Sequence, residues 1–342
     1  MSWLDRILEI EELEDAEFDE GLVATLEAGA AEISGRSIRF STPTFKEYNS
    51  SDLQGCSQNS FPAFSITAAG CALNCDHCQA KILEPMIPAT NPEMLDHKVR
   101  NLIKLQNLQG FLISGGSNRH NVINYGPYYP VIEKLKSDFP YLKIAIHTAL
   151  TDRAGAKSMA DAGVDTAMMD VIGSDKTIKE VYHLDRPVED FEATLEALCA
   201  TDMEIVPHIV AGLHYGEFVG ENTALDMIAR HKTHALVLVV VMPFYSKPGT
   251  FKVPATEEIG RLFYEARRRL QDRQVLLGCA RPPGMHKRIT DAYAVMAGLD
   301  GIAFPADGML AVSEAIGRPF EQAHACCSIK VGDTKNMRMC AA

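Results

Sequence analysis

Short apolar runs alternate with longer amphipathic stretches along most of the chain. Eight runs are apolar enough to form buried strands, and they span residues 61–68, 110–115, 142–149, 166–173, 204–212, 235–243, 274–281 and 300–306. The stretches between them show helical periodicity, as in residues 91–107, 151–163, 188–200 and 256–271. Strands that alternate with helices in this way pair in parallel through right-handed crossovers. The pattern therefore predicts an α/β fold.

The number and spacing of these units favour one α/β architecture. Eight strand–helix units over about 250 residues have the size of a TIM-type (β/α)8 barrel. A doubly wound open sheet is the competitor, but its Gly-x-Gly-x-x-Gly turn does not follow the first run. We therefore expect the barrel at residues 51–310. Residues 1–50 should form a helical extension, because residues 3–33 are rich in Leu, Glu and Ala, and residues 311–342 should form one helix and a cysteine-bearing tail.

Composition narrows the class of protein. The chain has 342 residues, of which 46% are hydrophobic and 23% charged, and its net charge is −12. These proportions are ordinary for a folded protein that needs no disulfides. No apolar run approaches the ~18–20 residues of a spanning helix, and the acidic N-terminus lacks the features of a signal peptide. We therefore expect a cytoplasmic protein without a membrane partner. The negative charge also argues against general nucleic-acid binding, which requires a basic face.

Three of the nine cysteines form a tight motif. Cys71, Cys75 and Cys78 have the spacing C-x3-C-x2-C and follow the first predicted strand, on the face where barrel active sites lie. Clustered cysteines in a reducing compartment bind metal or do redox chemistry more often than they form disulfides. Three thiolates can hold three irons of a [4Fe–4S] cluster and leave the fourth iron open for a substrate. The alternative is a structural zinc site completed by His77.

This motif in this context resembles the radical S-adenosylmethionine (SAM) superfamily, and the resemblance covers residues 61 to about 306. It implies an enzyme in which Cys71, Cys75 and Cys78 hold a [4Fe–4S] cluster whose open iron binds SAM. It also implies that one electron cleaves SAM to methionine and a 5′-deoxyadenosyl radical, which abstracts hydrogen from an unactivated carbon.

The resemblance also suggests residues that contact SAM. The stretch Ser114, Gly115, Gly116 and Ser117 takes the place of the family's Gly-Gly-Glu, which meets the SAM amino group, with Ser117 in place of the Glu. The glycines suit a backbone that a ligand approaches closely. His77 takes the place of an aromatic residue near the adenine. Residues 208–216 resemble the strand segment that lies against the adenosine.

Three polar residues lie at predicted strand ends, where barrel side chains serve binding or chemistry. They are His147, Asp170 and His208, near the ends of the third, fourth and fifth predicted strands. Asp170 could accept hydrogen bonds from the SAM ribose or amino group, and the histidines could hold substrate or the SAM carboxylate. Each could instead be an ordinary hydrogen-bonded structural residue. Residues 243–250 after the sixth run could form a lid or merely a turn.

Further features resemble the biotin synthase and lipoyl synthase branch, and within it a group that includes members of a split, two-protein lipoyl synthase. They are the helical N-terminal segment, the complete eight-strand pattern and the sequence LGCARPPG at residues 277–284. This resemblance implies sulfur insertion into an octanoyl chain in lipoyl-cofactor biosynthesis. The implied partners are an octanoylated carrier protein, a sister radical SAM protein, and ferredoxin or flavodoxin as reductant. The basic run at residues 265–273 could dock an acidic reductant, or it is the solvated face of a helix.

Sulfur insertion in that branch consumes an auxiliary iron–sulfur cluster, which needs further ligands. The candidate ligands are Cys56, Cys279, Cys326 and Cys327. Cys279 and Arg281 are two residues apart and so share a strand face, and in that branch an arginine late in the barrel touches the auxiliary cluster. Against this, buried cysteines often behave as small hydrophobic residues, and Cys199 is expected to be one.

Two other functions stay open. The C-x4-C-x5-C motif of single-chain lipoyl synthases is absent near the N-terminus. The chain could therefore be a single-cluster radical enzyme that rearranges, cleaves or methylates a small molecule. It could also be a non-catalytic metal-binding scaffold.

Overall fold

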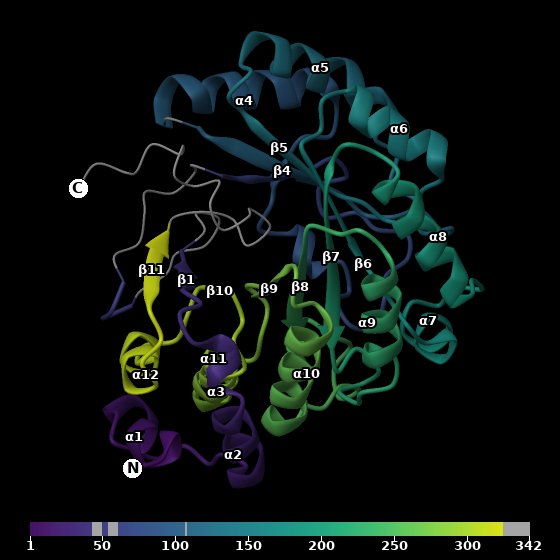
Figure 1. Ribbon diagram of the computed structural model, residues 1–342. Helices are drawn as coiled ribbons and strands as arrows, with labels where there is room; N and C mark the ends of the chain where they lie inside the picture. Colours follow the sequence, from purple (N-terminus) through teal and green to yellow (C-terminus); the bar gives the residue numbers. More distant parts are fainter. Residues whose placement is uncertain (43–49, 54–60, 107, 324–342) are drawn as a thin grey trace.

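A parallel sheet with helices on its outer side forms the framework of the molecule (Figure 1). The computed structural model describes residues 1–42, 50–53, 61–106 and 108–323. The strands are β1 (Ile38–Ser41), β2 (Ala63–Ser65), β3 (Ile87–Pro88), β4 (Gly110–Ser114), β5 (Lys143–His147), β6 (Thr166–Asp170), β7 (Glu204–Ala211), β8 (Ala235–Val240), β9 (Gln274–Leu277), β10 (Gly301–Ala303) and β11 (Phe320–Ala323). All eight strands predicted from the apolar runs are present, as β2 and β4 to β10.

The sheet is an open, curved half-barrel. Its order is β11-β1-β10-β9-β8-β7-β6-β5-β4-β2-β3, and every neighbouring pair is parallel. The parallel α/β arrangement confirms the first part of the prediction, but the closed eight-stranded barrel is not confirmed. Within the described residues, β10 pairs with β1 and β2 pairs with β3, so β10 and β2 do not meet to close a ring.

Twelve α-helices and three short 3-10 helices connect and cover the strands in the described ranges. The α-helices are α1 (Trp3–Leu8), α2 (Glu20–Ala28), α3 (Ala30–Ile33), α4 (Pro92–Gln106), α5 (Tyr129–Asp138), α6 (Arg153–Asp161), α7 (Asp175–Val181), α8 (Val188–Cys199), α9 (Glu221–Arg230), α10 (Thr256–Arg269), α11 (Met285–Met296) and α12 (Met309–Ala315). The 3-10 helices are η1 (Glu11–Leu13), η2 (Lys81–Leu83) and η3 (Gly126–Tyr128). No described helix is long and apolar enough to cross a membrane.

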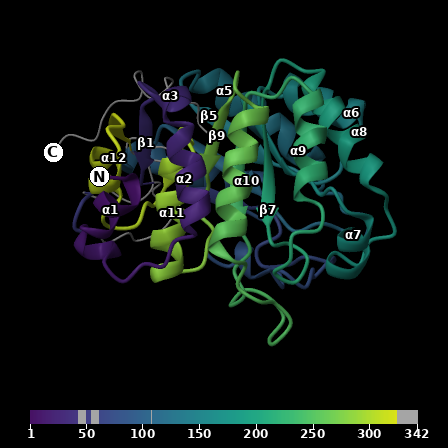
Figure 2. The same cartoon turned by 60° about the horizontal axis from the view of Figure 1, so that its bottom comes forward.

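The N-terminal segment forms several short helices instead of one continuous helix. Ser2 begins α1 with a capping box, and Asp19 begins α2 by accepting a hydrogen bond from the Leu22 amide at 2.7 Å. Gly35 follows α3 with a φ of 79°, a left-handed backbone that suits glycine. These helices pack beside α10, α11 and α12 (Figure 2). Residues 38–41 then join the sheet as β1 between β10 and β11.

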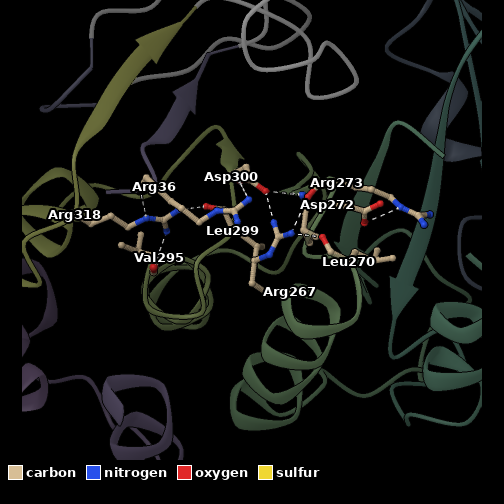
Figure 3. A network of polar contacts seen from close by, with 10 residues as sticks. Arg36, Arg267, Leu270, Asp272, Arg273, Val295, Leu299, Asp300 and Arg318 are labelled. Carbon is tan, nitrogen blue, oxygen red and sulfur yellow. Dashed lines mark hydrogen bonds and ion pairs between the residues drawn. The ribbon is translucent and has the colours of Figure 1, made fainter. Parts of the chain in front are cut away.

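A buried cluster of arginines around Asp300 fastens the end of the sheet opposite the strands' C-terminal ends (Figure 3). The Asp300 carboxylate accepts from Arg36 at 3.1 Å, from Arg267 at 2.5 Å and from the Val275 amide at 2.8 Å. Arg318 donates to backbone carbonyls, including that of Val295 at 2.7 Å. Burial lowers the pKa of Arg318 to about 10, still far above neutral pH. The cluster joins β1, α10, α11 and β11 of the half-barrel.

The basic run at residues 265–273 is largely engaged within the chain. Arg267 is buried in the Asp300 cluster. Arg269 pairs with Asp226 at 2.8 Å, and Arg273 donates to the Thr233 hydroxyl at 3.0 Å. These arginines therefore serve packing between helices and loops, and the structure adds no support to the expected docking of a reductant there.

Candidate active site

The C-terminal ends of the strands surround a cavity of about 340 Å3. Its wall is mostly apolar and includes Leu112, Met168, Val239 and Val241. Cys71, Cys75 and Cys78 line it, and it is also lined by residues singled out from the sequence, namely His77, Ser114, Gly115, Gly116, Ser117, His147, Asp170, His208 and Cys279. The fold thus gathers one loop and the ends of several strands around a single apolar space.

The loop that carries the cysteines is tightly turned. Asn74 and Ala80, on either side of Cys75 and Cys78, have left-handed backbones with φ of 47° and 58°. The Cys75 carbonyl accepts from the amides of Cys78 at 3.3 Å and Gln79 at 2.9 Å. These turns bring the thiols to one side of the loop, where Cys75 is buried and the other two are half-buried.

Two of the thiols interact directly. The hydrogen bond from Cys75 lowers the pKa of Cys78, burial opposes this shift, and the charge of His77 assists it. The same hydrogen bond, together with burial, raises the pKa of Cys75. Burial disfavours the charged form of His77, but the Cys78 thiolate and the nearby carboxylates of Asp170 and Asp76 raise its pKa overall. The loop therefore holds a thiolate, the form that ligates metal.

Glycines at the end of β4 allow the cysteine loop to pack against this strand. A Cβ on Gly116 would lie 2.0 Å from the Gly70 carbonyl oxygen and 2.7 Å from the Cys71 Cβ. The Gly116 amide donates to the Thr67 hydroxyl at 2.7 Å, and the Ser117 carbonyl accepts from the Ala72 amide at 2.9 Å. The Ser114–Ser117 stretch therefore packs directly against the cysteine loop. Its contact with SAM stays a prediction.

His147, Asp170 and His208 form a contiguous polar patch. They end or lie on the neighbouring strands β5, β6 and β7, and Asp170 is in register with His208. His147 Nε2 lies 3.6 Å from Asp170 Oδ1, and the two imidazole centroids are 5.3 Å apart. Parallel strands that end at one edge place these side chains together.

The charges within this patch are defined by its surroundings. Burial would raise the pKa of Asp170, but the hydrogen bond and charge of His147, with the charges of His208 and His77, lower it to about 2. Burial and the charge of His147 lower the pKa of His208 to about 4. His208 Nδ1 lies 3.1 Å from the Val206 carbonyl and must donate to it, which leaves Nε2 as an acceptor. At neutral pH the patch offers a carboxylate beside a neutral imidazole.

Tyr182, which the sequence analysis missed, completes the wall beside the cysteines. Its ring stacks on His77 with centroids 4.9 Å apart and planes inclined by 26°. His77 Nδ1 and Tyr182 Oη are both buried and have no hydrogen-bond partner in the described part of the chain. Such polar atoms next to a cavity are expected to meet a ligand or water. No sequence signal pointed to Tyr182, because only the fold brings it to His77.

The structure distinguishes between two residues that were expected at a second iron–sulfur cluster. Cys279 lines the cavity. Arg281 does not: its guanidinium is paired with Asp291 at 2.5 Å and donates to the carbonyls of Gly278 at 2.7 Å and Phe304 at 2.8 Å. The structure therefore gives no support to the expected role of Arg281 at a cluster, since the chain after β9 turns its side chain into the protein.

The other cysteines and the alternative of a single-metal site can also be compared with the expectations from the sequence. Cys56, Cys326 and Cys327 lie outside the described residues. Cys199 is half-buried against the core, as expected. In the described ranges, no three His, Cys, Asp or Glu side chains converge as a preformed site for a single metal ion.

Comparison of the sequence with models of protein families gives one match. A sequence model described as the radical SAM superfamily matches residues 65–220, which include the cysteine loop and the His147–Asp170–His208 patch. No curated protein matches the chain significantly in sequence.

Solved structures share the fold. Methylornithine synthase (PylB) is similar with a TM-score of 0.55 and 12% identity, over 89% of this chain and 86% of that chain. HydG, a maturase of the [FeFe]-hydrogenase, is similar with a TM-score of 0.58 and 14% identity, over 88% of this chain and 67% of that chain. HydG from Carboxydothermus hydrogenoformans has a TM-score of 0.54 and 14% identity, over 89% of this chain and 67% of that chain. Identities this low concern the fold alone.

These similarities give no support to the biotin synthase and lipoyl synthase branch that the sequence suggested. The segment that matches the radical SAM superfamily, residues 65–220, carries the three-cysteine loop at the mouth of the parallel half-barrel.

Proposed function

We propose that this chain cleaves SAM reductively at a [4Fe–4S] cluster and uses the resulting radical to abstract hydrogen from an aliphatic carbon. One observation carries the proposal: Cys71, Cys75 and Cys78 line the same apolar cavity as the strand-end patch of His147, Asp170 and His208. Candidate metal ligands and candidate ligand-binding groups thus border the same cavity.

The residues present fit the cluster and SAM. Three thiols from one loop, one of them with a strongly lowered pKa, suit three irons of a cluster. The unpartnered His77 Nδ1 and Tyr182 Oη suit polar atoms of a ligand that enters beside the cysteines. When bound, the cluster supplies one electron that converts SAM to methionine and a 5′-deoxyadenosyl radical.

The chain's own residues would orient the ligand and exclude water. The ionised Asp170 would accept hydrogen bonds from the ribose or amino group of SAM, and neutral His208 would accept one at Nε2. Met168, Val239 and Val241 present apolar surface that keeps water from a reactive carbon radical. A substrate whose reacting portion is aliphatic fits this wall best.

The step after hydrogen abstraction has two candidates. The first is sulfur insertion into an octanoyl group on a carrier protein. It would involve a sister radical SAM protein and a ferredoxin or flavodoxin as reductant. Cys279 favours this reaction, because it faces the cavity as a ligand of an auxiliary cluster should. The other candidate is a single-cluster reaction that rearranges, cleaves or methylates a small molecule, and methylornithine synthase shares the fold over 86% of its length.

Metal content and electron paramagnetic resonance (EPR) spectroscopy test these proposals. After anaerobic reconstitution, the wild type should hold at least about four irons per chain, and SAM should change the EPR signal of the reduced cluster. A Cys71→Ala/Cys75→Ala/Cys78→Ala variant that keeps about two or four irons reveals an auxiliary cluster and supports sulfur insertion. A variant without iron supports the single-cluster reaction. A wild type that binds zinc and gives no such signal supports the non-catalytic scaffold.

A further inference from the structure

Asp76 lies inside the cysteine motif but is turned away from the cavity. It follows Cys75 directly and is 7% exposed. Its neighbours Cys75 and His77 line the cavity, whereas Asp76 is not among the lining side chains. Its carboxylate instead meets residues that follow β6 and β7. A buried carboxylate within a metal-binding loop therefore has a use other than reaching the ligand space.

Four hydrogen bonds join Asp76 to three other segments at the mouth of the half-barrel. Its Oδ1 accepts from His183 Nε2 at 3.1 Å, and its Oδ2 lies 3.3 Å from the Tyr215 hydroxyl. Its amide donates to the Val181 carbonyl at 2.9 Å, and its carbonyl accepts from the Lys247 amide at 2.8 Å. These partners follow β6, β7 and β8 in turn. One residue thus connects the cysteine loop to the opposite side of the opening.

Both side chains that reach the carboxylate come from strained backbone. His183 has a φ of 57° and Tyr215 a φ of 56°. Residues other than glycine adopt this left-handed conformation at a cost, and they keep it where surrounding contacts require it. Here the conformation brings His183 and the Tyr215 hydroxyl to one carboxylate, and that hydroxyl also lies 3.0 Å from the Glu180 carbonyl. The arrangement is therefore more specific than a surface ion pair.

Asp76 is also connected to the loop between β8 and α10, which projects from the molecule (Figure 2). The loop is joined directly through the Lys247 amide. It is joined a second time through Tyr215, whose ring lies 5.1 Å from that of Phe251 and whose carbonyl accepts from the Lys252 amide at 3.1 Å. The loop and the cysteine motif are therefore joined at two points.

We infer that Asp76 is a positioning residue that fixes the orientation of the cysteine loop and couples it to the β8–α10 loop. The inference deepens the proposed function, because the loop that Asp76 holds is the one proposed to bind the cluster. The contacts themselves belong to the chain alone, so the coupling can be measured without a cluster.

Hydrogen exchange of the full-length, metal-free chain measures the coupling first. We compare the wild type with Asp76→Asn, which weakens the carboxylate contacts, and with Tyr215→Phe, which removes the hydroxyl. Glu84→Gln, a change to an exposed carboxylate of the same segment, is the control. We expect amides in residues 71–80 and 243–254 to exchange about tenfold faster together in Asp76→Asn, and less so in Tyr215→Phe. Exchange at the wild-type rate in either segment overturns the inference.

The reconstituted protein allows a second measurement, of cluster properties that would stay unchanged if Asp76 only stabilised the fold. Asp76→Asn should shift the reduction potential of the cluster and the EPR change caused by SAM, while Glu84→Gln leaves both as in the wild type. A lower melting temperature with an unchanged potential and spectrum overturns the positioning role. If the wild type fails to cleave SAM but the exchange coupling is present, the proposed function fails and the coupling stands.

Discussion

At the scale of single residues, the polar patch is defined by an ionised carboxylate that lies beside two imidazoles. Asp170 lies 3.6 Å from His147 and in register with His208. Burial opposes its charge, yet the histidines lower its pKa to about 2, so it is ionised at every pH at which the enzyme would work. A fixed negative charge at this point favours ligands that bring hydrogen-bond donors or a positive charge.

Removing that charge should weaken SAM binding. Asp170→Asn should raise the dissociation constant for SAM by about 10- to 100-fold, because a charge-assisted hydrogen bond contributes about 1.5–3 kcal/mol. Equilibrium dialysis with reconstituted protein measures this constant. Asp185→Asn, on the exposed turn before α8, is the matched control and should bind as the wild type does. Equal affinity in all three proteins contradicts the assigned contact.

His208 makes a contribution to stability that depends on pH. It is 8% exposed, and burial together with the charge of His147 lowers its pKa to about 4. A histidine binds a proton in the unfolded chain below its ordinary pKa of about 6.5, whereas His208 stays neutral in the folded chain down to about pH 4. The folded state is therefore progressively disfavoured as pH falls from about 6.5 to about 4.

This linkage predicts a measurable slope. Between pH 7 and pH 5 the wild type should lose about 2 kcal/mol of unfolding free energy through His208 alone. Urea unfolding at the two pH values should show that His208→Asn lacks this part of the loss. His120→Asn, a change to an exposed histidine, should keep it. A slope that survives in His208→Asn means that His208 is not held neutral by its surroundings.

Arg281 shows where reasoning from residue spacing reaches its limit. Its two-residue offset from Cys279 predicted a shared face, and Cys279 does face the cavity. The chain leaves the strand after Leu277, however, so alternation no longer applies at Arg281, which pairs instead with Asp291 on α11. A buried ion pair between residues ten apart has no local sequence signature.

The buried pair should matter for stability and not for metal content. Asp291→Asn leaves the Arg281 charge without its partner and should lower the unfolding free energy by about 3–5 kcal/mol. Arg281→Met should also destabilise the fold, while iron content after reconstitution stays at the wild-type level. Loss of iron with unchanged stability in Arg281→Met restores the role at a cluster.

At the scale of elements, the close packing of β4 on the cysteine loop depends on Gly116. A methyl group there would lie 2.0 Å from the Gly70 carbonyl oxygen, so the loop must shift. We expect Gly116→Ala to reconstitute with clearly less iron than the wild type. Gly21→Ala on α2, where the added carbon meets only ordinary contacts and alanine favours the helix, is the control and should retain full iron. Full iron in Gly116→Ala contradicts the need for this contact.

The elements that the sequence predicted best are the buried ones. Parallel strands covered on both faces are continuous apolar runs, as in β7 and β8, and all eight such runs form strands. The missed strands β1, β3 and β11 are two to four residues long, and β11 is largely polar and half-exposed. Their pairing depends on distant partners, which composition does not encode.

The site residues could be predicted from the sequence only where they form a motif or lie at the end of a predicted strand. Cys71, Cys75 and Cys78 are recognisable by spacing, and strand-end positions pointed to His147, Asp170 and His208. Tyr182 and the contacts of Asp76 come from segments far apart in the sequence.

At the scale of the whole molecule, the open half-barrel explains how one loop serves the entire cavity. The sheet extends beyond the eight expected strands, with β1 and β11 at one edge and β3 at the other. The strands from β4 to β8 contribute their ends to one cavity, and the cysteine loop after β2 reaches it as well. The chemistry is thereby placed at the carboxyl edge of the sheet, while the Asp300 cluster secures the opposite end (Figure 3).

Formation of 5′-deoxyadenosine is the most direct test of this account. Anaerobically reconstituted protein is incubated with SAM and dithionite, and 5′-deoxyadenosine and methionine are quantified. We predict that the wild type forms both in equal amounts and that the Cys71→Ala/Cys75→Ala/Cys78→Ala variant forms neither. A wild type that holds its cluster and yet leaves SAM intact, or a variant that cleaves SAM as fast as the wild type, contradicts the assignment of the three-cysteine loop as the reactive centre.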